Sequence, residues 1–240
     1  MLNTPTSARA SLVVWHITDS ALPTGAFSHS AGLETAVQAS EVVDAGSFLT
    51  WLRGYLRQAT YGEALAVVLA HRVGSVEKLA QLERVDLLVN NAGGAKELDF
   101  LRDADDADWE WMFQTNVMGT MRVTRALYPQ LKASKGLVVN IGSVAGTDAY
   151  KGGSGYNAAK HGLRGVTRAF RREEAENNIR VCEIDPGRVK TDFSLNRFGG
   201  DEERASKVYE GKQNLTADDI AEAVRWVASL PAHVNIDTMS

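Results

Sequence analysis

Apolar residues follow two different patterns along the chain, and the change comes near residues 72–85. Before it, they recur at the spacing of amphipathic helices, and Ser47 has the side chain and position of a helix N-cap. The segment after Ser47 shows this spacing at Phe48, Leu49, Trp51, Leu52, Tyr55 and Leu56. After Arg84, continuous apolar runs ended by Asn, Gly or Pro alternate with amphipathic segments. The pattern predicts a mainly helical first part and an α/β second part.

The second part holds three continuous apolar runs, typical of strands buried on both faces, at residues 85–91, 136–143 and 179–187. Helical spacing marks residues 109–121, 154–177 and 216–230, and residues 233–237 could add a short strand. Strands that alternate with helices of this length imply a parallel sheet covered on both sides. Thr216 is the expected N-cap of the last helix, Trp226 an expected packing residue, and Cys182 an expected core residue.

Composition and charge narrow the range of functions. Of the 240 residues, 44% are hydrophobic and 23% charged, as in an ordinary globular domain. The net charge of −4 is not gathered into a block, so nucleic acid is not an expected partner. The single cysteine fits a reducing compartment, and the apolar run at residues 12–17 is too short for a signal or membrane segment. These features predict a cytoplasmic protein, and the scattered histidines predict no metal site.

Tyr156 and Lys160 stand four residues apart in a predicted helix, so their side chains share one face. A free tyrosine has a pKa near ~10, which is too high for efficient acid–base chemistry at neutral pH. A lysine ammonium held close to it favours the phenolate and lowers that pKa. The pair can therefore carry proton transfer, although the same spacing also occurs on ordinary helix surfaces.

The surroundings of this pair favour the catalytic interpretation. Ser143 ends the second apolar run, "NNAGG" at residues 90–94 ends the first, and "DPG" at residues 185–187 ends the third. In an open parallel sheet, ligands bind beyond the carboxyl ends of the strands, and glycines let a backbone approach a ligand closely. We therefore expect the three turns to form one rim around a ligand.

Residues from about 76 to 240 resemble the C-terminal two thirds of a short-chain dehydrogenase/reductase. The matching motifs, in the family's order and spacing, are Asn90–Gly93, a helix around Asn116, Ser143, Tyr156-x-x-x-Lys160 and "DPGRVKT" through Thr191. The resemblance implies a partial Rossmann-like parallel sheet with flanking helices. It also implies NAD(P)-dependent oxidation of a small alcohol or reduction of a carbonyl compound, with homo-oligomer formation left open.

The resemblance implies a role for each matching residue. Tyr156 would be the general acid or base, Lys160 would lower its pKa and bind the nicotinamide ribose, and Ser143 would hold the substrate oxygen. Asn116 would support a proton relay through Lys160 and water. The cofactor-binding residues would be Asn90, Ala92, Gly93, Lys160, Pro186, Gly187, Val189 and Thr191. Neither the substrate nor the choice between NAD and NADP is readable from the sequence.

A complete member of this family also begins with a strand, a TGxxxGxG turn and a helix, which hold the cofactor pyrophosphate. The candidate turn is "TGAFSHSAG", residues 24–32, but His29 and Ala31 stand where the second and third glycines belong. The side chain at position 29 would fill space that phosphate oxygens need. We therefore expect weak or absent affinity for NAD or NADP.

Residues 21–58 are instead similar to the N-terminal part of the urease accessory protein UreF, an all-helical family that helps to assemble the nickel site of urease. The matching residues include Leu22, Pro23, Gly25, Ala26, Phe27, Ser28, Ser30, Gly32, Leu33, Glu34, Asp44, Ser47, Phe48, Trp51 and Leu52. The two resemblances divide the chain into a helical segment, residues 1–72, and a dehydrogenase-like part, residues 73–240. Alternatives to the enzyme are a scaffold for urease accessory proteins, and a nonfunctional or artificial fusion.

A dehydrogenase part without its first unit leaves the strand at residues 85–91 with an exposed apolar edge, which promotes aggregation. Residues 12–17 and 66–70 could supply strands that cover this edge. The pattern weighs slightly against these strands, and the helices of the UreF-like segment could shield the edge instead.

Overall fold

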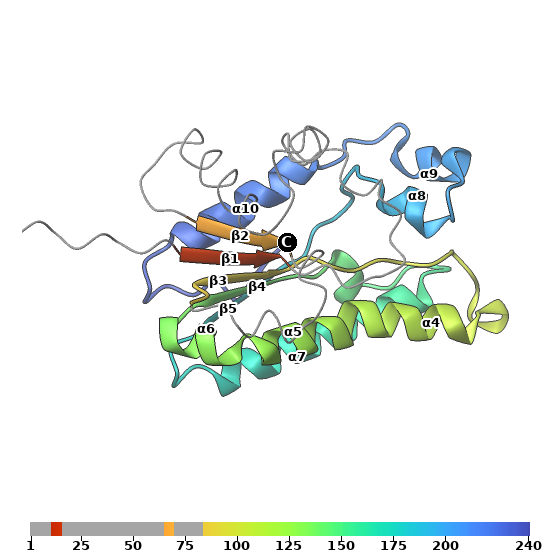
Figure 1. Ribbon diagram of the computed structural model, residues 1–240. Coiled ribbons are helices and arrows are strands. Elements are labelled where there is room, and N and C mark those ends of the chain that lie inside the picture. The colour runs from red at the N-terminus through yellow and green to blue at the C-terminus, as the bar shows by residue number, and fades with distance from the viewer. Residues whose placement is uncertain (1–10, 16–64, 70–83) are drawn as a thin grey trace, which may run out of the picture.

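The computed structural model describes residues 11–15, 65–69 and 84–240, with side chains described from residue 84 onward. Within these residues, one parallel sheet lies between two layers of helices (Figure 1). The strand order is β2-β1-β3-β4-β5-β6. The bounds are β1 Ser11–Trp15, β2 Leu65–Leu69, β3 Leu87–Asn90, β4 Leu137–Ile141, β5 Arg180–Ile184 and β6 Thr238–Met239. The predicted Rossmann-like parallel sheet with flanking helices is confirmed.

Strands β1 and β2 cover the edge of the sheet that the sequence left open. β1 pairs in parallel with β3, with Val13 opposite Leu87, and β2 pairs with the outer side of β1. The pattern of apolar residues weighed slightly against strands here. Pairing with β1, however, satisfies backbone N–H and C=O groups of β3 that would otherwise lack hydrogen-bond partners. Both strands come from the range 1–72, so these two stretches are strands and the sheet crosses the predicted boundary.

The helices divide between the two faces and the carboxyl end of the sheet (Figure 1). Helices α5, α6 and α7 lie on one face and α10 on the other, while α8 and α9 lie beyond the carboxyl ends of the strands. A π-helical turn, Gln114–Met118, joins α4 to α5. The bounds are α4 Asp106–Phe113, α5 Gly119–Ala126, α6 Tyr128–Ser134, α7 Ser154–Glu173, α8 Phe193–Arg197, α9 Glu202–Tyr209 and α10 Ala217–Ser229. None of the helices described is long and apolar enough to cross a lipid bilayer.

Neighbouring residues of β3, β4 and β5 point to opposite faces of the sheet, and each face has its own apolar cluster. Against α5 and α6, the buried residues are Val85, Leu88, Val123, Leu127, Leu131, Val138, Ile179 and Val181. Against α10, they are Leu87, Val89, Leu137, Val139, Cys182, Ile184, Val224 and Val227. Continuous apolar runs are the expected result of covering both faces. Cys182 is buried, as predicted, and burial raises the pKa of its thiol to about 11.

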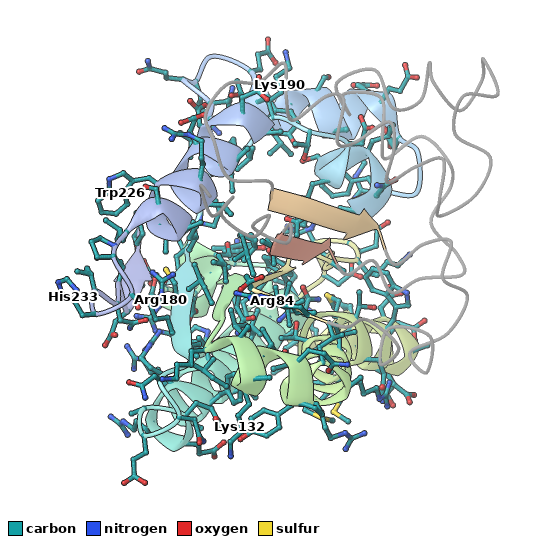
Figure 2. All side chains as sticks on the ribbon, turned by 60° about the vertical axis from the view of Figure 1, so that its left-hand side comes forward. Arg84, Lys132, Arg180, Lys190, Trp226 and His233 are labelled. Carbon is teal, nitrogen blue, oxygen red and sulfur yellow. The ribbon has the colours of Figure 1, made fainter. Side chains whose placement is uncertain are left out.

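The local sequence of helix α10 determines where the helix begins and which of its faces is buried. The Thr216 side chain accepts from the backbone N–H of Asp219, and the Asp219 carboxylate accepts from the backbone N–H of Thr216, which confirms the predicted N-cap. Val224 and Val227 face the sheet. Trp226 falls on the other side of the helix, where it projects outward and is 45% exposed (Figure 2). Its predicted packing role is wrong for that reason.

Candidate active site

The carboxyl ends of β3, β4 and β5 bring the three predicted turns to one rim. Ser143 lies two residues after the end of β4, Gly93 three residues after β3, and Gly187 three residues after β5. The strands are held in parallel register, with Asn90 opposite Asn140 and Ile141 opposite Ile184. Backbone bonds tie the second turn to the third, because Gly142 donates to the carbonyl of Ile184 and Val144 donates to that of Pro186.

Tyr156 stands in the first turn of α7, with its ring 8% exposed. The ring meets Phe193 edge to face, at 5.6 Å between centroids. Burial raises the pKa of the Tyr156 phenol well above its ordinary value, while the Ser143 hydroxyl and the charge of Arg197 act in the opposite direction. Ser143 itself is buried, and its hydroxyl accepts a hydrogen bond from the backbone N–H of Ala145 at 3.1 Å.

Lys160 follows Tyr156 by one turn and is 4% exposed. Its Nζ donates to the carbonyl oxygen of Ile141 at 2.9 Å and lies 5.8 Å from the centre of the Tyr156 ring. Burial lowers the pKa of Lys160 to about 8, and the carboxylates of Glu183 and Asp185 oppose that shift. The groups that shift the Tyr156 pKa here are Ser143, Tyr150 and Arg197 beside burial itself, and the lowering of that pKa by Lys160 stays a prediction.

Asn116 lies in the π-helical turn between α4 and α5 and is fully buried. Its amide exchanges two hydrogen bonds with the backbone of Gly94, since Oδ1 accepts from the N–H at 3.2 Å and Nδ2 donates to the C=O at 2.9 Å. Nδ2 also donates to the carbonyl of Met112. Asn116 therefore holds the turn after β3 in place, and π-helical turns of this kind are frequent at functional sites.

Gly93 has no room for a side chain, because Asn116 packs against it. A Cβ atom on this residue would lie 2.5 Å from Oδ1 of Asn116 and 3.4 Å from Nζ of Lys160. Gly187, across the rim, has nothing within 4 Å of where its Cβ would stand. The open side of Gly187 lets a ligand approach the backbone closely at this rim of the sheet.

Of the other predicted cofactor-binding residues, some lie at the rim and one is buried in the interior. Ala92, Pro186 and Val189 are half-buried and Thr191 is exposed, where its hydroxyl accepts from the backbone N–H of Phe193. The Asn90 side chain instead points inward and is 2% exposed.

The Asn90 amide nitrogen donates to Thr124 and to Asn140, and Asn140 donates to Thr167. These four side chains form a polar ladder from β3 and β4 to α5 and α7. Asn90 therefore contributes to this ladder rather than to the open face of the rim.

A buried ionic cluster under Ser143 was missed by the sequence reasoning. Asp185 Oδ1 accepts from the backbone N–H of Ser143 at 3.0 Å, and Oδ2 lies 2.6 Å from Nη1 of Arg164. Glu183 is fully buried beside them, and burial together with Asp185 raises its pKa to about 7. The signal was Glu183 inside a mainly apolar strand and Asp185 directly after it, since buried acidic residues are unusual without a partner.

Arg197 and Tyr150 are a second pair that the sequence did not indicate. Arg197 ends α8, is 8% exposed, and donates from Nη1 to the Tyr150 hydroxyl at 2.9 Å. Its guanidinium carbon lies 5.8 Å from the centre of the Tyr156 ring. No pattern in residues 193–211 distinguishes this arginine from an exposed one, because only the tertiary packing of α8 buries it.

Two predictions concern residues outside those described. The turn "TGAFSHSAG" and the UreF-like stretch, residues 21–58, both fall in the range 16–64. Among the residues that are described, no group of three or more His, Cys, Asp or Glu side chains is placed to hold a metal ion.

Comparisons with known proteins give the following findings. The family model described as short chain dehydrogenase matches residues 71–200. An uncharacterised oxidoreductase of Mycobacterium tuberculosis is 52% identical over 144 residues, which cover 60% of this chain and 57% of that protein. An NADP-dependent 3-hydroxy acid dehydrogenase of Escherichia coli K12 is 41% identical over 175 residues, covering 70% and 71%. The matched region thus spans somewhat more than half of the first of these relatives. No support for the UreF-like segment came from these comparisons.

Two solved structures are similar to this chain in fold. The closed form of serine dehydrogenase complexed with NADP+ superposes with a TM-score of 0.69, at 38% identity over 80% of this chain and 79% of that one. Serine dehydrogenase from Escherichia coli superposes with a TM-score of 0.63, at 30% identity over 95% of both chains.

Proposed function

Because the chain belongs to the short-chain dehydrogenase family, we propose that it is an NAD(P)-dependent oxidoreductase that interconverts a small alcohol and its carbonyl compound. One observation carries the proposal: Ser143, Tyr156 and Lys160 are all buried at one rim, beside the turn that contains Gly93. A bound NAD or NADP supplies or accepts the hydride, and the protein supplies orientation and proton transfer.

Tyr156 moves the proton at the substrate oxygen. In oxidation, its phenolate takes the alcohol proton, and in reduction its phenol returns a proton to the carbonyl oxygen. The Ser143 hydroxyl holds the same oxygen, and Asp185 fixes the serine through its backbone N–H. Burial keeps the Tyr156 pKa high in the free protein, so a positive charge that comes near the phenol on cofactor binding favours the phenolate.

Lys160 and Asn116 support this step from two different helices. Both pack against Gly93, where a Cβ would lie 2.5 Å from Oδ1 of Asn116 and 3.4 Å from Nζ of Lys160. Lys160 binds the nicotinamide ribose through the protons of Nζ not used by Ile141, and Asn116 supports a proton path that passes Lys160 and water. The observed bonds of Asn116 to Gly94 support its part as the holder of that turn.

NADP is the favoured cofactor, since the Escherichia coli relative is named as NADP-dependent and the serine dehydrogenase structure contains NADP+. We expect affinity for it to be weakened, because His29 and Ala31 stand where the family has glycines. The scaffold alternative rests on residues 21–58 and has no support from the comparisons, so the enzyme is the better account.

Titration with NADPH and NADH, followed by quenching of tryptophan fluorescence, tests the proposal. Trp109 and Trp111 lie in the apolar cluster around Tyr156, so a ligand at the rim should change their emission. We expect weak binding that favours NADPH. Micromolar binding would show that the expected weakening is wrong, and no binding at about 1 mM would contradict the oxidoreductase itself.

A further inference from the structure

Two acidic side chains at the end of β5 face two basic side chains of α7 in the interior. Glu183 lies in β5 and Asp185 directly after it, and residues two positions apart on an extended chain point to the same side. Lys160 and Arg164 follow Tyr156 at intervals of four residues, so they share one side of α7. Glu183 and Asp185 are excluded from solvent, and Lys160 is 4% exposed. The helix face that carries the proton-transfer pair therefore continues into a cluster of buried charges.

The Glu183 carboxyl group is the least satisfied member of this cluster. Arg164 lies 2.6 Å from Asp185 but 3.7 Å from Glu183, so Asp185 takes the closer ion pair. Neither carboxylate oxygen of Glu183 has a hydrogen-bond partner among the described residues. A buried carboxylate without a partner destabilises a fold, and replacing buried ion clusters by apolar side chains is often neutral or stabilising. The position of Glu183 therefore favours a role other than stability.

Glu183 can hold a proton between itself and Asp185. Two ionised carboxylates cannot hydrogen-bond to each other, whereas a protonated carboxyl group donates to a carboxylate. Both side chains lie against Gly142, because a Cβ there would stand 2.9 Å from Oε1 of Glu183 and would collide with Oδ1 of Asp185. Burial, the charge of Asp185 and a hydrogen bond to Asp185 raise the pKa of Glu183 to about 7. Glu183 thus changes from neutral to negative in the neutral pH range.

Lys160 meets the surroundings of Glu183 at the peptide unit between Ile141 and Gly142. Nζ of Lys160 donates to the carbonyl oxygen of Ile141 at 2.9 Å, and Glu183 lies against Gly142, the next residue. Burial lowers the pKa of Lys160 to about 8, and the charges of Glu183 and Asp185 act against burial. The charge of Glu183 therefore favours the ammonium form of Lys160.

The elements packed against Glu183 supply its other charged neighbours. Arg164 and Arg171, both on α7, favour its ionised form. Across the sheet, the neutral residues Asn140 of β4 and Thr238 of β6 stand opposite it. The Glu183 carboxyl group therefore ionises against the charge of Asp185 and with the help of two arginines.

We propose that Glu183 is a positioning residue of the active site, whose negative charge keeps Lys160 protonated and so extends the pH range in which Lys160 can serve Tyr156 and the cofactor ribose. This inference rests on the proposed function, because it concerns the charge of the same lysine. Below about pH 7, Glu183 is neutral and Lys160 holds its proton without help. Between about pH 7 and 8, Glu183 is negative where Lys160 would otherwise lose its proton.

The test follows the protonation of Lys160 by NMR, in protein labelled with carbon-13 at the lysine Cε and without cofactor or substrate. Lys160→Arg identifies the signal of Lys160. In the wild type this signal should titrate at about pH 8. Glu183→Gln keeps the shape of the side chain and removes its charge, so the titration midpoint of Lys160 should fall by about 1 pH unit.

Two further variants separate charge from packing. Glu183→Asp keeps the charge on a shorter side chain and should restore part of the fall seen in Glu183→Gln. Glu174→Gln is the matched control, because Glu174 is also buried and lies at the end of α7, but its carboxylate contacts Tyr128 and Asn177. The Lys160 midpoint in this control should equal that of the wild type.

The affinity for NADPH measures the same effect at the proposed site. Since Lys160 is proposed to bind the ribose as an ammonium, the affinity should decline as the pH rises through the Lys160 midpoint. In Glu183→Gln this decline should begin about 1 pH unit lower than in the wild type. A displacement of Ser143 or Lys160 would instead weaken binding about equally at every pH, which would contradict the role of charge.

The outcomes distinguish this inference from the proposed function. An unchanged Lys160 midpoint in Glu183→Gln would overturn the inference, and so would an equal fall in Glu174→Gln. Both results would leave the oxidoreductase intact, because the NMR titration uses no cofactor. Absence of NADPH binding to the wild type at about 1 mM would instead refute the proposed function, and with it the role of Glu183 in the site, whatever the Lys160 midpoint.

Discussion

The Asp185 carboxylate connects the backbone of Ser143 to the guanidinium of Arg164. One oxygen accepts the N–H of Ser143 at 3.0 Å, and the other lies 2.6 Å from Nη1 of Arg164, with the whole side chain excluded from solvent. Ser143 is therefore positioned from β5, the neighbouring strand, and not only by its own strand. The position of the substrate-facing hydroxyl depends on an ion pair underneath it.

Replacing Asp185 with Ala should destabilise the protein by about 3 kcal/mol, because it leaves Arg164 without its nearest partner and the N–H of Ser143 without an acceptor. Asp185→Asn keeps an acceptor for Ser143 and should cost less. Urea unfolding at neutral pH measures both free energies. A loss below about 1 kcal/mol for Asp185→Ala would show that the cluster contributes little.

Glu183 should make stability depend on pH. Its pKa is raised from 4.5 to about 7 in the folded protein, so between these values the folded state binds more protons than the unfolded state. The stabilising contribution is fully present below pH 4.5 and is lost as the pH rises through 7. Glu183→Gln mimics the protonated acid and should gain about 2 kcal/mol over the wild type at pH 8, with no gain at pH 4.5.

The measurement is the free energy of unfolding of both proteins at several pH values. Glu222→Gln, on the exposed face of α10, is the control, since Glu222 pairs with Arg225 at the surface. A difference between Glu183→Gln and the wild type that stays constant from pH 4.5 to pH 8 would contradict the prediction.

Gly142 should not tolerate a side chain. A Cβ at this position would collide with Oδ1 of Asp185 and lie 2.9 Å from Oε1 of Glu183, and both carboxylates are held in the buried cluster. Gly142→Ala is expected to cost about 1–3 kcal/mol and to lower kcat by displacing Ser143. Gly165, on the exposed side of α7, has nothing within 4 Å of its Cβ position.

Gly165→Ala is therefore the matched control and should stabilise the protein by about 0.5–1 kcal/mol, because alanine favours the helix. Thermal unfolding of the two variants should move in opposite directions. If both variants shifted in the same direction, the close packing behind Gly142 would not be the cause.

Tyr156→Phe removes one hydroxyl and should reduce turnover at least about 100-fold, since no described group is placed to replace the proton donor. The ring keeps its contact with Phe193, so the unfolding temperature and NADPH binding should change little. Retained turnover would remove Tyr156 from the proton-transfer step. Loss of both turnover and the cooperative unfolding transition would instead indicate a packing role.

The sequence predicted those strands and helices whose residue pattern is compatible with a single type of secondary structure and burial. Continuous apolar runs ended by glycine or asparagine require burial on both faces, and this identified β3, β4 and β5. The spacing of Tyr156 and Lys160 likewise fixed their common face on α7. The pairing of β1 with β3 was only one of two alternatives for the open edge, because 71 residues separate Trp15 from Leu87 and nothing local specifies the partner.

Some residues of the candidate active site could not be predicted from the sequence, for a similar reason. Arg164, Arg197 and Glu183 read as ordinary surface charges, since their burial depends on what α7, α8 and β5 pack against. Burial also lowers the pKa of Lys160 to about 8, and its spacing from Tyr156 could not show this shift. Burial changes the chemistry of such groups, and a spacing rule contains no information about burial.

The ladder of Asn90, Asn140, Thr124 and Thr167 also determines how the rim is aligned. Asn90 and Asn140 are direct partners across β3 and β4, and both side chains point to the α5 and α7 side. A register shift of β3 by one residue would place the Asn90 amide in the apolar cluster against α10. The described residues of that cluster offer the amide no polar side chain as a hydrogen-bond partner. The ladder therefore makes a shifted pairing of β3 with β4 less stable than the observed one. In the observed register, the turn that contains Gly93 lies beside the turn that contains Ser143.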